Sequence, residues 1–177
     1  MIHENCKIGV GVKIGHGVVI DEGCIIGDNV FIGHNTIIRE HCRIQSNVVI
    51  GHLCLIEKMT KIGYGTVVQS QCHITAMADI GERCYFGPSV TIINEWRISK
   101  WRNRVMKQKL RGPKIGQGCR IGAKSLIMPG VVIGENAVVG AGSTITKDIA
   151  DREIWIGPQA EMKGMVPENE FPSEVAR

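Results

Sequence analysis

Every sixth residue from position 2 to position 92 is aliphatic or, once, aromatic. This anchor column has sixteen members: Ile2, Ile8, Ile14, Ile20, Ile26, Ile32, Ile38, Ile44, Ile50, Ile56, Ile62, Val68, Ile74, Ile80, Phe86 and Ile92. The same spacing returns 23 residues later at Ile115, Ile121, Ile127, Ile133, Val139 and Ile145. A period of six matches neither the 3.6-residue period of an amphipathic helix nor the two-residue period of a strand. It predicts a solenoid in which each hexad forms one short strand and one turn.

A second column of small residues follows each anchor by four positions. It begins with Cys6, Val12, Val18, Cys24, Val30, Thr36, Cys42 and Val48, and it resumes after the break with Cys119, Ser125, Val131, Ala137 and Ser143. One large and one small inward residue per hexad suit a narrow parallel β-helix, whose coils stack about 4.8 Å apart. The position before each small residue is commonly glycine or asparagine, as at Gly17 and Asn35. Both residue types accept a positive φ at a corner.

All seven cysteines fall in this small inward column. An inward cysteine behaves as a small buried hydrophobe, and the CxxC spacing typical of metal sites is absent from the sequence, so we expect no metal. Free thiols in this number suit a reducing compartment. The repeats begin at residue 2, no run of 18 apolar residues occurs, and no secretory leader is recognisable. We expect a cytoplasmic protein of one domain, residues 1–177, without membrane contact.

Three phrases extend this pattern. They are FGPSVTIIN at 86–94, IGAKSLIMPGVVIGENAVVGAGSTITKD at 121–148 and IWIGPQAEMKG at 154–164. With the hexads, they resemble the hexapeptide-repeat acyltransferase superfamily, and most closely its N-acetyltransferases of nucleotide-linked amino sugars. The resemblance implies an all-β, left-handed parallel β-helix with three hexads per coil. Coils 2–92 and 115–150 would be separated by an extruded basic loop, 93–114, and followed by a C-terminal cap, 151–177.

With three hexads per coil, the residue before each anchor points outward and forms one column on each face. The first face carries Val19, Ile37, Leu55, His73 and Thr91, the second Lys7, Ile25, Arg43, Lys61 and Asp79, and the third Lys13, Phe31, Val49, Val67 and Tyr85. Two apolar outer faces would expose more apolar surface than is usual for a monomer, and the resemblance implies a homotrimer.

Three histidines, His16, His34 and His52, lie exactly one coil apart at the edge where the third face meets the first. Their spacing favours a row of hydrogen-bonding corner residues. Related trimeric carbonic anhydrases hold zinc between subunits with three histidines, and a metal site of that kind is the alternative.

The interruption at 93–114 contains eight basic residues and a single acid, Glu95. Long loops in compact domains are commonly functional, and arginine and tryptophan together suit a phosphorylated ligand with a stacking base. We therefore predict substrate binding by Trp96, Arg97, Trp101, Arg102 and Arg104. The alternative is a solvated loop pinned by its tryptophans. Nucleic acid fits less well, because the basic residues are confined to one loop.

The resemblance also assigns chemistry to single residues. Asn94 takes the position of the asparagine that meets the acceptor amine near the thioester, and His73 is the nearest candidate base, although an interface histidine is the alternative. Acetyl-CoA is expected along the later coils. The predicted contacts are backbone groups near Ala123, Ala141 and Gly142 for its pantetheine arm, and Lys124, Lys147 and Lys163 for its phosphates.

The predicted function is therefore an acetyl-CoA-dependent N-acetyltransferase of an amino sugar, with a small nucleotide-linked acceptor. Orienting a partly neutral amine and stabilising the oxyanion would meet most of the catalytic need. Three alternatives remain: a carbonic-anhydrase-like metalloenzyme, a sugar O-acetyltransferase, and a non-catalytic scaffold that would leave the basic loop without a purpose.

Overall fold

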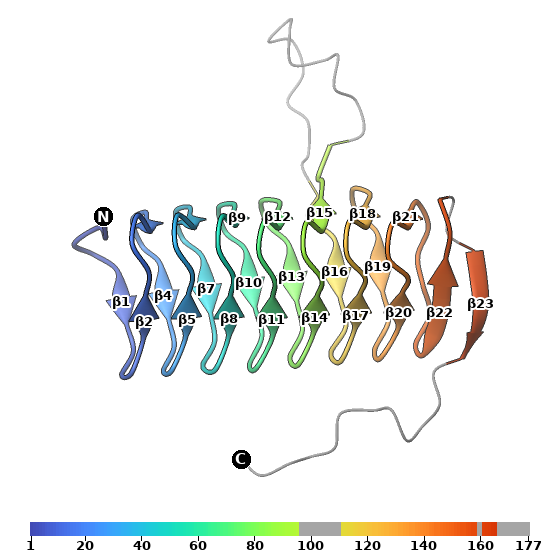
Figure 1. Ribbon diagram of the computed structural model, residues 1–177, viewed down its shortest axis with the longest axis horizontal. Coiled ribbons are helices and arrows are strands. Elements are labelled where there is room, and N and C mark those ends of the chain that lie inside the picture. Colours follow the sequence, from blue (N-terminus) through green and yellow to red (C-terminus); the bar gives the residue numbers. More distant parts are fainter. Residues whose placement is uncertain (96–110, 159–160, 166–177) are drawn as a thin grey trace, which may run out of the picture.

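The computed structural model describes residues 1–95, 111–158 and 161–165, and in those ranges its regular secondary structure is entirely β (Figure 1). No helix able to cross a membrane occurs within these described ranges. Three sheets run along the long axis of the molecule, and the coils contribute parallel strands to them in turn. The predicted fold, a left-handed parallel β-helix of hexapeptide repeats, is confirmed.

The strands of each face are short and regularly spaced. The first face comprises β3 (Val19–Ile20), β6 (Ile37–Ile38), β9 (Leu55–Ile56), β12 (His73–Ile74), β15 (Thr91–Ile92), β18 (Leu126–Ile127) and β21 (Thr144–Ile145). The second comprises β1 (Lys7–Ile8), β4 (Ile25–Ile26), β7 (Arg43–Ile44), β10 (Lys61–Ile62), β13 (Asp79–Ile80), β16 (Lys114–Ile115) and β19 (Val132–Ile133). The third comprises β2 (Lys13–Ile14), β5 (Phe31–Ile32), β8 (Val49–Ile50), β11 (Val67–Val68), β14 (Tyr85–Phe86), β17 (Arg120–Ile121), β20 (Val138–Val139), β22 (Glu153–Ile156) and β23 (Glu161–Met165).

The strand register proves the coil length. Neighbouring strands pair residues 18 apart, as in Lys7 with Ile25 and Phe31 with Val49. Across the break, Asp79 pairs with Lys114, which is 35 residues on. The excess over one coil is 17 residues, so the chain leaves the solenoid and returns to the same register.

The interior is filled by the two inward columns, as predicted. Anchors from Ile20 onward are almost completely buried, whereas Ile2, Ile8 and Ile14 of the first coil stay partly exposed at the open N-terminal end. Six cysteines are buried and Cys6 is half-buried, and all seven are free thiols.

The small inward column also has a hydrogen-bonding role that the sequence pattern did not reveal. The Cys42 thiol donates to the Glu57 carbonyl at 3.1 Å, and the Thr36 hydroxyl donates to the Gly51 carbonyl at 2.7 Å. In both cases the acceptor lies 15 residues further along the chain. A hydrogen bond with Cys24 one coil earlier, together with burial, raises the pKa of the Cys42 thiol. These thiols are therefore donors that satisfy the coil, which explains why cysteine, threonine and serine are interchangeable in this column.

The corners adopt left-handed backbone at the predicted position, including Gly17 and Asn35. The same conformation occurs at Leu53, Met59 and Arg83, whose residue types do not favour it. The stacked backbone hydrogen bonds on both sides of each corner impose the conformation there, so tertiary structure overrides local preference.

The chain leaves the coil later and returns earlier than predicted. Ile93 still donates its N–H to the Ile127 carbonyl at 3.0 Å. On return, the Arg111 carbonyl accepts from the Gly130 N–H at 3.1 Å, and the Pro113 carbonyl accepts from the Asp79 N–H at 3.0 Å. The predicted loop boundaries of 93–114 were therefore too wide, because Ile93 and residues 111–114 belong to the coil.

The C-terminal end is covered by two longer strands. Strand β22 pairs in parallel with β20, and β23 turns back antiparallel to β22. Trp155 packs against the core, and its indole N–H donates to the Glu153 carboxylate at 2.8 Å. Ile156, at the end of β22, is 47% exposed.

Candidate active site on one edge of the solenoid

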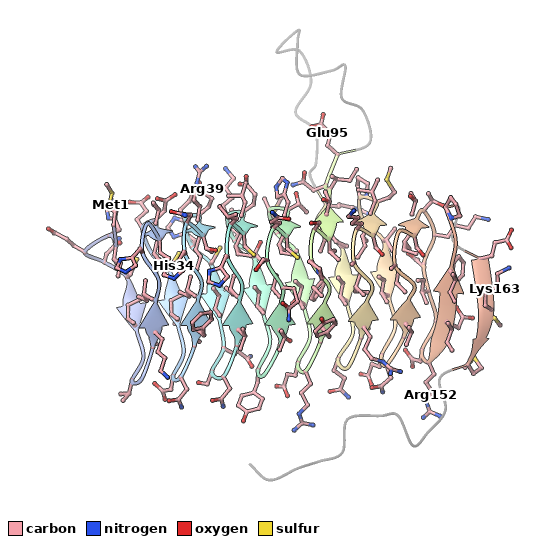
Figure 2. The ribbon with its side chains drawn as sticks, in the orientation of Figure 1. Met1, His34, Arg39, Glu95, Arg152 and Lys163 are labelled. Carbon is pink, nitrogen blue, oxygen red and sulfur yellow. The ribbon has the colours of Figure 1, made fainter. Side chains whose placement is uncertain are left out.

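The edge where the third face meets the first is organised by one residue per coil. We call it the ladder edge, and its members, each two residues after a third-face anchor, are His16, His34, His52, Ser70, Pro88, Ala123 and Ala141. The His16 N–H donates to His34 Nδ1 at 2.7 Å, and the His34 N–H donates to His52 Nδ1 at 2.8 Å. The His52 N–H donates to Ser70 Oγ at 3.1 Å. The imidazole rings stack, with centroids 5.3 and 5.1 Å apart (Figure 2 labels His34).

These hydrogen bonds determine which imidazole nitrogen carries the proton. Because Nδ1 of His34 and His52 accepts a backbone N–H, the ring proton of each neutral imidazole lies on Nε2. A metal bound at Nε2 would need the lone pair that this proton occupies. The ladder therefore supports the hydrogen-bonding interpretation of the histidines, and a metal site there would require the ladder to break.

The second half of the ladder edge lacks such side-chain acceptors. Pro88 can neither donate a backbone N–H nor accept with its side chain, and the alanine side chains of Ala123 and Ala141 carry no polar atom. The main-chain pairing continues, since the Lys124 N–H reaches the Pro88 carbonyl at 2.9 Å and the Gly142 N–H reaches the Ala123 carbonyl at 2.8 Å. We call residues 88, 123, 124, 141 and 142 the alanine strip.

The alanine strip is open to an extended ligand. Ala141, Gly142 and Lys124 are exposed, Ala123 is half-buried, and a Cβ added to Gly142 would meet no atom within 4 Å. The seat at which His34 accepts the preceding coil's N–H is filled at Ala141 by a methyl group. A ligand with its own carbonyl groups can accept that N–H instead. Four predicted cofactor contacts therefore lie together on this strip: Ala123, Lys124, Ala141 and Gly142.

The two predicted catalytic residues lie elsewhere in the same chain. His73 points outward from β12 in the middle of the first face, is half-buried, and pairs across the sheet with Thr91. Asn94 lies at the edge between the first and second faces, where the chain leaves the coil, and its side-chain N–H donates to the Ala76 carbonyl at 3.4 Å. One chain thus places Asn94 and the alanine strip on the two opposite edges of the first face.

The remaining predicted contacts are spread out. Lys147 is exposed on the same edge as Asn94, and Lys163 lies in β23, where its ammonium pairs with the Glu161 carboxylate at 3.0 Å. The loop residues Trp96, Arg97, Trp101, Arg102 and Arg104 lie outside the described residues.

Sequence reasoning missed a pocket at the C-terminal hairpin. It has a volume of about 700 Å³ and is lined by Ile156, Gly157, Pro158, Glu161 and Lys163. The Gly157 N–H donates to Ser143 Oγ at 3.2 Å, which ties the pocket to the last coil. The proline and glycine of the phrase IWIGP were the available signal, because they mark a turn after the last long strand.

The chain belongs to the bacterial transferase hexapeptide (six repeats) family, whose profile matches residues 1–33, 23–58 and 112–147, together more than half of the sequence. This family assignment agrees with the uninterrupted hexads and with the three-sheet solenoid described above.

The names of two curated relatives specify activities more closely than the family name does. A galactoside O-acetyltransferase of Lactococcus lactis is 34% identical over 92 residues, which cover 51% of this chain and 44% of that protein. A dTDP-3-amino-3,6-dideoxy-alpha-D-galactopyranose 3-N-acetyltransferase of Aneurinibacillus thermoaerophilus is 48% identical over 52 residues, which cover 29% and 27%. The matched regions thus span less than half of the length of these relatives.

A solved structure shares the fold. AntD, an N-acyltransferase from Bacillus cereus determined with dTDP and coenzyme A, superposes with a TM-score of 0.54 at 20% identity, covering 92% of this chain and 85% of AntD. At this identity the likeness concerns the fold alone.

Proposed function

We propose that this protein transfers an acetyl group from acetyl-CoA to the amine of a nucleotide-linked sugar. The observation that carries the proposal is the alanine strip, a stretch of coil edge from which the side-chain acceptors of the ladder have been removed. The pantetheine arm of coenzyme A is an extended chain with two amides, so it can replace those acceptors and donors along the strip. Its phosphates would then lie near the C-terminal pocket that contains Lys163.

The relatives support the two parts of this proposal unequally. The two curated relatives reported above are named as acetyltransferases, which supports acyl transfer. The name of one relative specifies a nucleotide-linked amino sugar. The name of the other specifies a galactoside hydroxyl, so sugar O-acetylation is the second candidate function.

The reaction depends more on orienting the acceptor amine than on a strong base. The amine nitrogen bonds to the thioester carbonyl carbon, the carbon–sulfur bond breaks, and coenzyme A leaves as a thiolate. The proton lost by nitrogen goes to that thiolate, either directly or through His73. Asn94 would orient the amine or stabilise the oxyanion with its amide. Pairing of Arg97, Arg102 and Arg104 with the nucleotide diphosphate, and stacking of Trp96 and Trp101 on its base, stay predictions from the sequence.

A homotrimer would complete the site. Asn94 and the alanine strip lie on opposite edges of the first face, so a neighbouring copy packed on that face is needed to bring the strip of one chain to the Asn94 of another. The outer columns that would pack are apolar, with Phe31, Ile37 and Val49 each more than a third exposed. Exposed apolar side chains gathered along adjoining faces are typical of an interaction surface.

The substitution Val49→Glu is expected to convert the trimer to monomers, because it places a carboxylate in the middle of this apolar column. Light scattering measures the mass of each form. Lys61→Glu, on the second face, is the matched control and should leave the mass unchanged. A monomeric wild-type protein would overturn the assembly.

Acetyl-CoA is expected to raise the melting temperature, because a ligand that binds the folded state stabilises it by about 2.7 kcal/mol at a hundred times its Kd.

Release of free coenzyme A thiol should follow addition of a nucleotide-linked amino sugar. Asn94→Ala should lower kcat at least tenfold and leave the KM for acetyl-CoA within about twofold. Thiol release with sugar hydroxyls but with no sugar amine would transfer the proposal to O-acetylation.

A further inference from the structure

The ladder edge and the adjoining first face become polar at one level of the solenoid. On the first face the outward column changes from Val19, Ile37 and Leu55 to His73 and Thr91. At the same level the corner holds Ser70, Gln71 and Ser89. These five polar residues, which we call the polar island, lie at the level where the histidine half of the ladder edge ends and the alanine strip begins.

The polar island contains hydrogen-bond donors that can bind a further partner. The Ser89 hydroxyl donates to Gln71 Oε1 at 3.2 Å, which orients the glutamine amide. Within the described residues this leaves both N–H groups of the Gln71 amide for another partner, and Gln71 is exposed. Ser70 Oγ already accepts from His52, but Pro88 in the next coil has no side-chain acceptor for the Ser70 N–H.

An aromatic ring lies in the same coil as Ser89. Tyr85, outward on β14 of the third face, is 43% exposed. In the third-face column, Tyr85 stands between Val67 in the coil before and Arg120 in the coil after. A tyrosine ring with apolar faces and a hydroxyl tip suits the face of a sugar ring, and the amide and hydroxyl groups of the corner that follows this strand suit the sugar hydroxyls.

We infer that Gln71, Ser89 and Tyr85 form a saccharide subsite that receives the hydroxyl-bearing ring of the acceptor. This inference rests on the proposed acetyltransferase function and adds the residues that read the sugar. Gln71 lies in the coil before Pro88, where the alanine strip begins, and Ser89 follows Pro88 directly. A ring held there meets the reacting end of a pantetheine arm that runs toward the C-terminal cap. His73 and Thr91, on the adjoining face of the same two coils, complete its polar rim.

The test uses the full-length protein with wild-type, Gln71→Leu, Ser89→Ala and Tyr85→Ala forms. Arg83→Leu is the matched control, because Arg83 occupies the same left-handed corner seat on another edge. The probes are nucleoside-diphosphate-linked amino sugars, each paired with an analogue that lacks one ring hydroxyl. Each subsite variant should raise the KM for the intact acceptor about tenfold, which corresponds to 1.4 kcal/mol, with the KM for acetyl-CoA and the melting temperature close to wild type.

The deoxy analogues separate recognition from folding. If Gln71 binds the missing hydroxyl, Gln71→Leu and the deoxy analogue should cost about tenfold each alone and little more together. If the wild-type protein acetylates sugar amines and all three subsite variants have the same acceptor KM as Arg83→Leu, the subsite is overturned and the proposed function stands. Acetyl transfer confined to amines without a sugar ring, or no turnover and no binding of any nucleotide sugar, would overturn both.

Discussion

Replacing Gly112 with alanine is expected to lower the free energy of unfolding by about 3 kcal/mol, because a methyl group there would overlap the Met77 carbonyl in the coil below. Gly112 lies where the chain re-enters the solenoid, between Arg111 and Pro113, whose carbonyls both hold neighbouring coils. The backbone on each side is fixed by these bonds and cannot move aside. For a protein of this size the melting temperature should fall by roughly 10 °C, as measured by scanning calorimetry.

Gly65→Ala separates steric overlap from backbone strain. Gly65 has a positive φ, but a Cβ added there would meet only the Arg83 side chain at 3.8 Å. Its cost should be the conformational one alone, about 1 kcal/mol. Equal losses for Gly65→Ala and Gly112→Ala would show that the re-entry point is not tightly packed.

The substitution Ala141→His is expected to weaken acetyl-CoA binding roughly 100-fold, about 2.7 kcal/mol, without lowering the melting temperature. A histidine at this seat can accept the Ala123 N–H as His34 accepts the His16 N–H. It would therefore extend the ladder into the alanine strip, occupy the proposed path of the pantetheine arm and remove a backbone donor from it. Isothermal titration with acetyl-CoA measures the loss.

His34→Ala is the reciprocal control. It removes the acceptor of the His16 N–H and the ring stacked against both neighbours, so stability should fall by about 1 kcal/mol. Acetyl-CoA binding should stay at the wild-type value, because His34 lies in the N-terminal half of the edge. If Ala141→His binds acetyl-CoA as well as wild type does, the alanine strip is not the cofactor path.

Some of the predicted site residues could be positioned from the sequence and others could not, depending on whether the repeat extends to them. The resemblance named Ala123, Lys124, Ala141 and Gly142 as cofactor contacts, and the 18-residue period puts them on one edge. The same period could not say how Asn94 stands relative to them, since the chain leaves the coil at that residue. The pocket between β22 and β23 was missed because the hexads have ended there and no period remains to position side chains.

The sequence by itself determined the solenoid. The six-residue period determined which side chains point inward, the alternation of large and small inward residues determined how narrow the interior is, and multiples of 18 determined which residues stack. These are local and repetitive constraints, and each hexad states them again. The resemblance to known acyltransferases, rather than the period, supplied the left hand of the helix.

Tertiary structure alone decided what the repeat leaves free. It set the exact points of exit after Ile93 and return at Arg111, because these depend on which carbonyls remain to be paired in the adjoining coils. It gave His34 and His52 the same tautomer, because Nδ1 of each ring accepts an N–H from the preceding coil. It forced Leu53, Met59 and Arg83 into left-handed backbone against their own preference. In each case the deciding partner lies a whole coil away in the chain, where no local sequence signal can specify the contact.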